Sequence, residues 1–123
     1  MIGAVSWSIL VVDDDCVFRS LAALLLADVG FVVVGEAATA EEAIAAAHEL
    51  KPDAVLVDVG LPDGNGVALA RELVALPWGP RVVLTSADPN TTRAEDVRES
   101  GAGGFVPKDE LANAPLQQLL ALG

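Results

Sequence analysis

The chain is predicted to adopt an α/β fold in which five parallel strands, in the spatial order 2-1-3-4-5, form the middle layer of a three-layer sandwich. Two observations support this prediction. Apolar, β-branched runs alternate five times with stretches of helical periodicity, which favours a parallel sheet with helices on both faces. Two of those runs end directly in acidic residues, Asp13 to Asp15 and Asp58, at the sheet edge where ligands of such folds bind.

The first third of the chain is expected to form a strand, a helix and a second strand. Leu21, Leu24 and Leu25 are apolar residues at helical spacing and predict a helix over Cys16–Val29. Gly30 follows and is expected to end that helix. The flanking strands are predicted at Ser8–Val12 and Phe31–Gly35.

The middle of the chain is expected to form a helix, a strand and a long turn. Thr39 and Glu42 make a capping-box signature, so the second helix is expected to begin at Thr39 and to end before Pro52. Asp53–Val57 is apolar and β-branched, as a buried parallel strand should be. The segment from Gly60 to Gly66 is dense in turn-forming residues and is predicted to be a loop.

The last part of the chain repeats the alternation and ends in a short helix. Gly101 is expected to end the fourth helix, and Pro115 is allowed in the first turn of the fifth. The predicted helices are Gly66–Ala75, Asn90–Ser100 and Pro115–Leu122. The predicted strands are Arg81 to Thr85 or Ser86, and Gly104–Pro107.

Composition limits the partners of the chain. Its 123 residues, 53% of them hydrophobic, suit a single domain over residues 1–123. The formal charge of −11 argues against binding of nucleic acid or of an anionic membrane by this chain, because phosphate contacts need clustered Lys and Arg. No apolar stretch reaches membrane-spanning length, and the N-terminus lacks a secretory signal. The single cysteine, Cys16, suits a reducing cytoplasm and is expected to pack at the start of the first helix.

Acidic residues are expected to meet where the first and third strands end side by side. Asp13, Asp14 and Asp58 would then share one small pocket, and their charges would repel one another. A divalent cation relieves that repulsion, and oxygen ligands with room for water suit Mg²⁺. Asp15 is interpreted as the cap of the first helix, since Asp is a favoured N-cap residue.

The same pocket is suited to phosphoryl transfer. An aspartate such as Asp58 can attack phosphorus and form an acyl phosphate, and the reaction needs mainly positioning and charge neutralisation. Lys108, at the end of the fifth strand, is the candidate cation. A hydroxyl at the end of the fourth strand, Ser86 or Thr85, is the candidate hydrogen-bond donor to a phosphoryl oxygen.

Four sequence motifs occur in order along nearly the whole chain. They are Val11-Val12-Asp13-Asp14; Val57-Asp58 with Leu61-Pro62 and Gly64-Asn65-Gly66; Leu84-Thr85-Ser86-Ala87; and Gly101-Ala102-Gly103-Gly104-Phe105-Val106-Pro107-Lys108. Together they resemble the receiver domain of two-component response regulators, which implies a flavodoxin-like (βα)5 fold.

The resemblance also implies roles for individual residues. Asp58 would be the phosphoacceptor, and Mg²⁺ would be bound by Asp14, Asp58 and the backbone carbonyl of Gly60. Asp13 would hydrogen-bond outside the groups that touch the metal, and Lys108 would pair with the phosphoryl group. Phe105 would correspond to the aromatic switch position of the family.

Two details of the resemblance concern the hydroxyl and the loop after the lysine. Thr85 and Ser86 point to opposite faces of the strand, and Ser86 is preferred because Lys108 follows it by 22 positions, as in the family. The family usually has proline directly after the lysine, whereas Asp109 stands there. A trans bond is therefore expected at Lys108–Asp109, and the loop and last helix are expected to differ.

The function expected from the resemblance is that of a phosphoacceptor switch rather than an enzyme. It would take the phosphoryl group from a histidine kinase or phosphotransfer protein and act on a downstream protein, or on an effector domain beyond this sequence. A homodimer is expected through the fourth helix, fifth strand and fifth helix.

Three alternatives remain open from the sequence. Phe31 to Ala37 resembles the second strand of regulators with a C-terminal helix-turn-helix, so the chain could belong to a DNA-binding transcriptional regulator. A Mg²⁺-dependent phosphatase of the haloacid-dehalogenase type would need a second aspartate where Gly60 stands. The third is a receiver-like adaptor that takes no phosphoryl group.

Overall fold

Five parallel strands form one sheet in the order β2-β1-β3-β4-β5. The structure is a computed structural model that describes residues 7–120, and it describes residue 91 by its backbone only. The order confirms the flavodoxin-like arrangement expected from the sequence. The strands are β1 (Trp7–Val12), β2 (Phe31–Ala37), β3 (Ala54–Asp58), β4 (Arg81–Ser86) and β5 (Gly104–Pro107).

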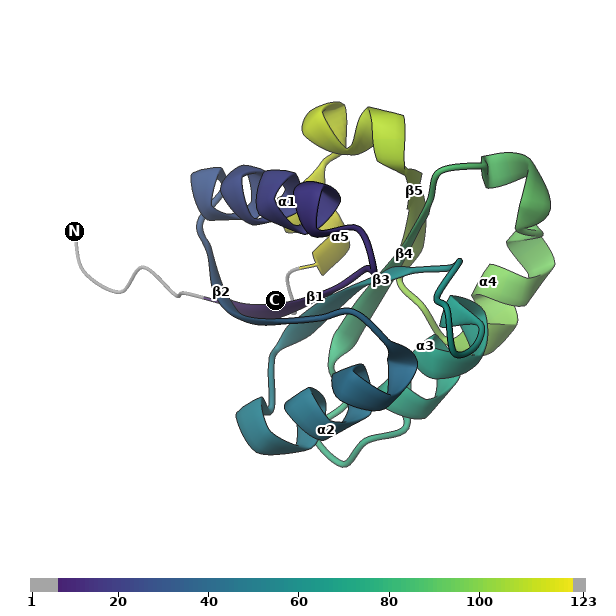
Figure 1. Ribbon diagram of the computed structural model, residues 1–123, viewed down its shortest axis with the longest axis horizontal. Helices are drawn as coiled ribbons and strands as arrows, with labels where there is room; N and C mark the ends of the chain where they lie inside the picture. The colour runs from purple at the N-terminus through teal and green to yellow at the C-terminus, as the bar shows by residue number, and fades with distance from the viewer. Residues whose placement is uncertain (1–6, 121–123) are drawn as a thin grey trace.

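Helices cover both faces of the sheet and complete the three layers (Figure 1). The helices are α1 (Cys16–Asp28), α2 (Ala40–Leu50), α3 (Gly66–Val74), α4 (Ala94–Ser100) and α5 (Leu116–Leu120), with two 3-10 helices, η1 (Pro89–Thr91) and η2 (Lys108–Asn113). α1 and α5 pack on one face, and α2, α3 and α4 on the other. None of the helices within residues 7–120 has the length and apolarity needed to span a membrane.

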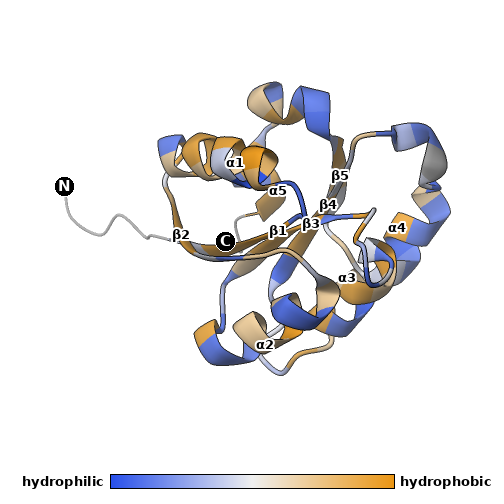
Figure 2. Cartoon of the chain, in the orientation of Figure 1, coloured by the Kyte–Doolittle hydropathy of each residue, from blue (hydrophilic) through white to orange (hydrophobic). Residues whose placement is uncertain are grey.

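Alternation along the central strands divides the interior into two cores. Ile9 and Val11 of β1 are buried beneath α1 and α5, whereas Leu10 and Val12 are buried beneath α2 and α3. Both faces of β1 are therefore apolar, as a central parallel strand requires. Figure 2 shows the resulting hydrophobic sheet, with polar residues on α2 and α4, whereas α1 is mostly hydrophobic.

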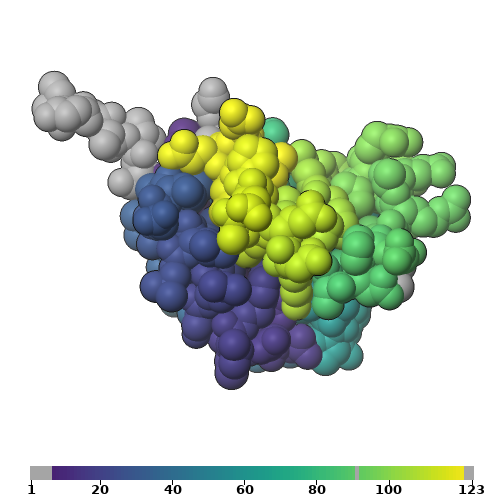
Figure 3. Space-filling model, turned by 90° about the horizontal axis from the view of Figure 1, so that it is seen from above, coloured from purple at the N-terminus to yellow at the C-terminus, as the bar shows by residue number. Residues whose placement is uncertain are grey.

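The C-terminal segment packs against both α1 and the sheet. From above, the yellow-green and yellow segment of η2 and α5 lies against the blue and purple α1 (Figure 3). Leu111 of η2 and Leu116 of α5 belong to the core that also contains Phe18 of α1. Gln117 Nε2 donates a hydrogen bond of 2.6 Å to the Val29 carbonyl. The end of β5, and with it Lys108, is thereby held next to the start of α1.

Several predicted helix ends are confirmed by their caps. The Thr39 hydroxyl accepts a hydrogen bond from the Glu42 N–H at 3.1 Å, so Thr39 is the N-cap of α2. Gly30 follows α1 with a φ of 102°, a left-handed conformation that glycine adopts without strain. The Asp15 side chain caps α1 by accepting from the Val17 and Phe18 N–H groups, as interpreted from the sequence.

The leucines that indicated the first helix do not all face the core. Leu21 and Leu24 are 48% and 72% exposed, and the residues that face the core are Phe18, Ala22 and Leu26. The helix carries apolar residues around most of its circumference, so periodicity alone could not fix which side packs on the sheet. Cys16, expected to pack at the start of the helix, is exposed.

The predicted start of α4 is also wrong. The helix begins at Ala94 and not at Asn90, because Pro89–Thr91 forms a separate 3-10 turn. The Asp88 side chain caps that turn by accepting from the Asn90 N–H at 3.1 Å. Thr92 and Arg93 then have extended backbone angles, which separate the turn from the helix.

The trans bond expected at Lys108–Asp109 is present. η2 occupies the loop after β5, and every peptide bond of the described residues is trans, including Lys108–Asp109. The last helix, predicted over Pro115–Leu122, is α5 at Leu116–Leu120. Positions 121 and 122 of that prediction lie outside the described residues.

Candidate functional site

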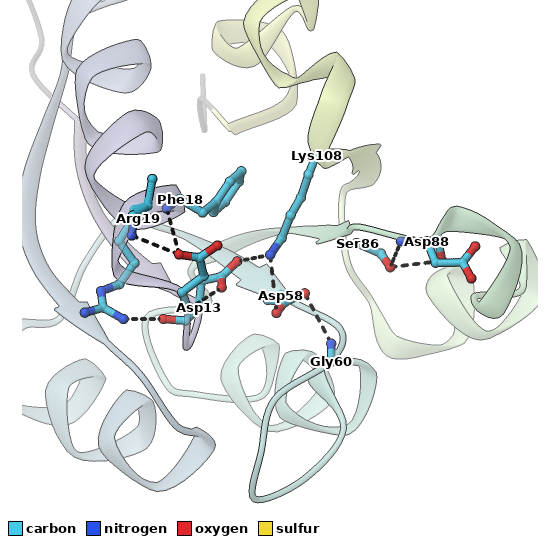
Figure 4. Close-up of polar contacts among 10 residues, drawn as sticks. Asp13, Phe18, Arg19, Asp58, Gly60, Ser86, Asp88 and Lys108 are labelled. Atoms are coloured by element: carbon cyan, nitrogen blue, oxygen red, sulfur yellow. Dashed lines mark hydrogen bonds and ion pairs between the residues drawn. The ribbon is translucent and has the colours of Figure 1, made fainter.

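The carboxyl ends of β1, β3 and β5 bring four charged side chains into one pocket. One carboxylate oxygen from each of Asp13, Asp14 and Asp58 lies within 4.8 Å of the others. Lys108 Nζ lies 2.6 Å from Asp13 Oδ2 and 3.6 Å from Asp58 Oδ2. Figure 4 shows the lysine reaching down between the two carboxylates from the start of η2. The convergence expected from the strand order is therefore present.

Asp13 is fixed at the bottom of the pocket by backbone contacts. Its side chain is fully buried, and Oδ1 accepts a hydrogen bond from the Asp15 N–H at 2.9 Å. Its own N–H donates to the Ala37 carbonyl at 2.9 Å, which explains why β2 extends to Ala37. Arg19 Nη1 donates to the Asp13 carbonyl at 2.6 Å and Arg19 Nε pairs with Glu36 at 2.8 Å. These contacts leave Asp13 little freedom to follow a ligand.

Asp58 is held at the end of β3 by the loop that follows it. The Gly60 N–H donates a hydrogen bond of 3.2 Å to Asp58 Oδ1, and the Gly66 N–H donates to the Val59 carbonyl at 2.8 Å. A Cβ at position 66 would collide with the Asp58 carbonyl oxygen and lie 2.6 Å from the Val59 Cα. Glycine at 66 thus permits the close approach that positions Asp58.

The pocket is open to solvent beside Gly60. Gly60 is exposed, and apart from Gly60 itself and its two chain neighbours no atom of the described residues lies within 4 Å of the place where its Cβ would be. Asp14 is also exposed, whereas Asp13 and Asp58 are buried. A ligand can therefore approach Asp58 from the side of Gly60 and Asp14.

Burial and charge shift the proton affinities of the two central groups. Burial raises the pKa of Asp58, and the Asp13 carboxylate raises it further, while the Gly60 N–H and the Lys108 ammonium act in the opposite direction. Burial alone would lower the pKa of Lys108, but its hydrogen bond to Asp13 and the charges of Asp58 and Asp13 outweigh burial and raise it. Lys108 is therefore a permanent cation at neutral pH, facing two carboxylates that repel each other.

The two candidate hydroxyls lie in different environments. The Ser86 hydroxyl donates to the Asp88 carbonyl at 3.0 Å and accepts from the Asp88 N–H at 3.1 Å, so it faces the loop after β4 and not Asp58. Thr85 pairs with Asp58 in the β3–β4 ladder. Its hydroxyl is buried without a hydrogen-bond partner among the described residues. The preference for Ser86 over Thr85 stays a prediction.

The donor set fits a hard divalent cation. The three carboxylates supply only oxygen, as Mg²⁺ prefers, and the open side at Gly60 leaves room for water ligands. Asp14 is the exposed carboxylate of the three, and Asp13 is engaged by Lys108 more closely than Asp58 is, at 2.6 against 3.6 Å. This agrees with the predicted set of Asp14, Asp58 and the Gly60 carbonyl, whose roles stay predictions.

Three residues that support the site were not singled out from the sequence. Phe18 places its ring 4.5 Å from Lys108 Nζ, and Arg19 holds the Asp13 backbone. Asp63, in the loop after β3, accepts from the Ala40 and Glu41 N–H groups at 2.7 and 3.1 Å and so ties that loop to the start of α2. These are contacts between distant segments, and no local pattern in the sequence marks them.

Comparison with known proteins identifies the family. The model of the response regulator receiver domain matches residues 9–120. The chain belongs to the response regulator receiver domain family. It is 39% identical over 109 residues to the DNA-binding transcriptional activator DevR/DosR of Mycobacterium tuberculosis, and 29% identical over 100 residues to the chemotaxis protein CheY of Thermotoga maritima. These matches cover 85% and 81% of this chain.

A solved receiver of the same family has the same fold. The chain superposes with a TM-score of 0.79 on a two-component response regulator of the LuxR family from Aurantimonas sp. SI85-9A1, at 29% identity, over 94% of this chain and 86% of that one. The relatives differ in what lies beyond the receiver. This chain spans 50% of the length of DevR/DosR but 83% of the length of CheY.

Proposed function

We propose that Asp58 accepts a phosphoryl group from a phosphohistidine of a histidine kinase or phosphotransfer protein, in a reaction that requires Mg²⁺. The observation that carries this proposal is the position of Asp58, which lies beside the acidic pair Asp13–Asp14 and has the Lys108 ammonium 3.6 Å from its carboxylate. A nucleophilic carboxylate next to both a cation and an acidic cluster meets the requirements of phosphoryl transfer.

In the proposed reaction, a carboxylate oxygen of Asp58 attacks phosphorus. The bond from phosphorus to the imidazole nitrogen breaks, and the electron pair leaves with the imidazole. When bound by Asp14, Asp58 and the Gly60 carbonyl, Mg²⁺ neutralises charge on the phosphoryl oxygens. Lys108 supplies a second positive charge from 3.6 Å away, and its ion pair with Asp13 orients the ammonium toward the pocket. The Gly60 N–H steadies one oxygen of Asp58.

The proposed switch begins at Ser86. Its hydroxyl is satisfied by the backbone of Asp88, and a phosphoryl group on Asp58 would offer it a charged acceptor instead. Release of Asp88 would loosen η1, which Asp88 caps, and so shift the segment leading into α4 and Phe105. Charge-driven ordering of this kind is a common switching mechanism, with couplings of about 1–3 kcal/mol.

The chain is proposed to act as a switch and not as an enzyme with a separate product, and to work in the cytoplasm with its phosphodonor. Its output would be a contact with a partner protein or with an effector domain. The 39% identity to DevR/DosR supports the second possibility, in which the receiver belongs to a DNA-binding regulator. We propose that the receiver forms a homodimer through α4, β5 and α5, which sedimentation with and without beryllofluoride would test.

Beryllofluoride tests the phosphoacceptor directly, because with Mg²⁺ it mimics an acyl phosphate. The amide spectrum of the wild type should shift around residues 58, 86 and 108 when both reagents are present. Asp58→Ala should show no such shift, and the control Glu72→Gln, which removes an exposed carboxylate of α3 outside the pocket, should respond as the wild type does. No shift in the wild type, or an undiminished shift in Asp58→Ala, would overturn the proposal.

A further inference from the structure

Lys108 has a third neighbour besides its two carboxylates. Its Nζ lies over the ring of Phe18, 4.5 Å from the centroid, well inside the distance of about 6 Å at which an aromatic face attracts a cation. The ammonium is thus enclosed by Asp13, by Asp58 and by the ring. Figure 4 shows the ring of Phe18 beside the lysine stem, on the α1 side of the pocket.

The position of the ring does not depend on Lys108. Phe18 is 8% exposed and belongs to the core between the sheet, α1 and α5. Its N–H is held by the Asp15 cap at 3.4 Å. Lys108, by contrast, has a flexible four-carbon stem and stands at the first residue of η2. The rigid partner is therefore the ring, and the mobile partner is the ammonium.

The lysine is shared unequally between its two carboxylates. Asp13 Oδ2 is 1 Å closer to Nζ than Asp58 Oδ2 is, at 2.6 against 3.6 Å. A lysine drawn further toward Asp13 would leave Asp58 without its cation. The aromatic face occupies one side of the ammonium, limits its hydration and adds no competing charge. An aliphatic residue at position 18 would fill the same core volume but would supply no electrostatic attraction.

We propose that Phe18 is a positioning residue for Lys108: the face of its ring holds the ammonium above Asp58 and so sets the rate at which Asp58 takes up a phosphoryl group. The effect on the phosphorylation rate, which we call the rate component, rests on the proposed function. The geometric component is the contact between the Lys108 ammonium and the ring of Phe18, and it needs no phosphodonor and no metal.

The geometric component is tested by NMR of the metal-free protein. The side-chain methylene protons next to Lys108 Nζ should be shifted upfield by the ring current in the wild type and in Phe18→Trp. Phe18→Leu, which keeps an apolar residue in the core, should return those shifts to the values of an ordinary lysine. Unshifted methylene protons in the folded wild type would overturn the inference whether or not the chain is phosphorylated.

The rate component is tested by fluorination of the ring. Stepwise replacement of Phe18 by mono-, di- and trifluorinated phenylalanine weakens the attraction for a cation with little change of shape. The rate of phosphorylation by acetyl phosphate with Mg²⁺ should fall with each fluorine, and Phe18→Leu should slow it about five- to thirty-fold. The matched control is the same series at Phe31, a buried residue of the same core at the opposite end of the sheet, where rates should not change.

The outcomes separate the two proposals. A wild type that takes up no phosphoryl group refutes the proposed function. In that case the ring-current shifts still test whether the Lys108 ammonium lies on the ring of Phe18. A wild type that is phosphorylated at a rate insensitive to fluorination of Phe18 refutes the positioning role. Equal losses in the Phe18 and Phe31 series would show a general effect on the core and would also refute it.

Discussion

The Asp58 carboxylate, which we propose as the phosphoacceptor, lowers the stability of the metal-free fold when it is ionised. Burial and the nearby Asp13 charge raise its pKa in the folded state. A carboxyl group whose folded pKa exceeds its unfolded value destabilises the fold at every pH where it is ionised. A bound cation would offset this penalty, which gives the cation a source of differential affinity for the folded site.

Asp58→Asn is therefore expected to stabilise the metal-free protein at pH 7. A gain on the order of 1 kcal/mol would raise Tm by about 4 °C. The gain should vanish as the pH falls through the folded pKa of Asp58, because the wild-type carboxyl is then protonated too. Calorimetry between pH 4 and 8 measures the difference in Tm between the variant and the wild type over the range in which a carboxyl group with a raised pKa titrates. Glu72→Gln, on the exposed side of α3, is the control. A lower Tm for Asp58→Asn at pH 7 would contradict the argument.

The adjacent hydroxyls give a second test at the scale of single residues. Ser86→Ala is expected to slow phosphorylation about tenfold or more, since a hydrogen bond to a charged group is worth about 1.5–3 kcal/mol. Thr85→Val is the matched variant. It should leave the rate unchanged and should not destabilise the fold, because it replaces a buried hydroxyl that has no partner among the described residues. Acetyl phosphate kinetics on both variants decide between them, and the reverse pattern would assign the role to Thr85.

At the scale of elements, strands and helix caps were predictable and the phase of α1 was not. The strands β1 and β3 are continuous apolar runs, and Thr39 and Gly30 mark helix ends by local chemistry. α1 has apolar residues on several sides, so only contact with the sheet selects Phe18, Ala22 and Leu26. The start of α4 was mispredicted for a different reason, because the Asp88 side chain caps a separate 3-10 turn, η1, before the helix begins.

Substitutions on the two sides of α1 test its orientation. Leu24→Gln, on the exposed side, is expected to change stability by less than about 0.5 kcal/mol. Leu26→Ala removes a fully buried side chain and is expected to cost about 2–5 kcal/mol. Urea unfolding of both variants measures the difference. Comparable losses at the two positions would mean that the helix is rotated from the orientation described.

The site itself followed the same division between local and distant signals. Asp13, Asp14, Asp58 and Lys108 were predictable because each stands where a strand ends, and strand order brings those ends together. Phe18, Arg19 and Asp63 reach the site through tertiary contacts. No spacing rule links position 18 to position 108 or position 63 to position 40, so sequence patterns could not reveal them.

The tie between Asp63 and α2 predicts a pH-dependent loop. The Ala40 and Glu41 N–H groups lower the pKa of Asp63. A carboxylate whose pKa is lowered in the folded state stabilises the fold at pH values above its pKa in the unfolded chain, which is about 4. That stabilisation is lost as the pH falls through the folded pKa. Asp63→Asn should therefore speed amide exchange at Ala40 and Glu41 at neutral pH, with Glu72→Gln as control. Unchanged exchange at both amides would refute the tie.

At the scale of the whole molecule, the acidic pocket links metal binding to folding. A cation that binds only the folded chain stabilises it by about 2.7 kcal/mol at a hundred times its Kd. Mg²⁺ should therefore raise the Tm of the wild type progressively with concentration. Asp14→Ala should abolish most of this rise, since it removes an accessible carboxylate of the cluster. A rise of equal size in Asp14→Ala would place the binding elsewhere.

The fold places the proposed nucleophile, the Lys108 ammonium and the acidic cluster at one edge of the sheet, so the covalent adduct is the decisive observable. After incubation with acetyl phosphate and Mg²⁺, borohydride reduction converts an aspartyl phosphate to homoserine, which peptide mass spectrometry locates. Conversion at Asp58 is the predicted result. Conversion at Asp13 or Asp14 in place of Asp58, or no conversion in folded wild-type protein, would contradict the assignment of Asp58 as the phosphoacceptor.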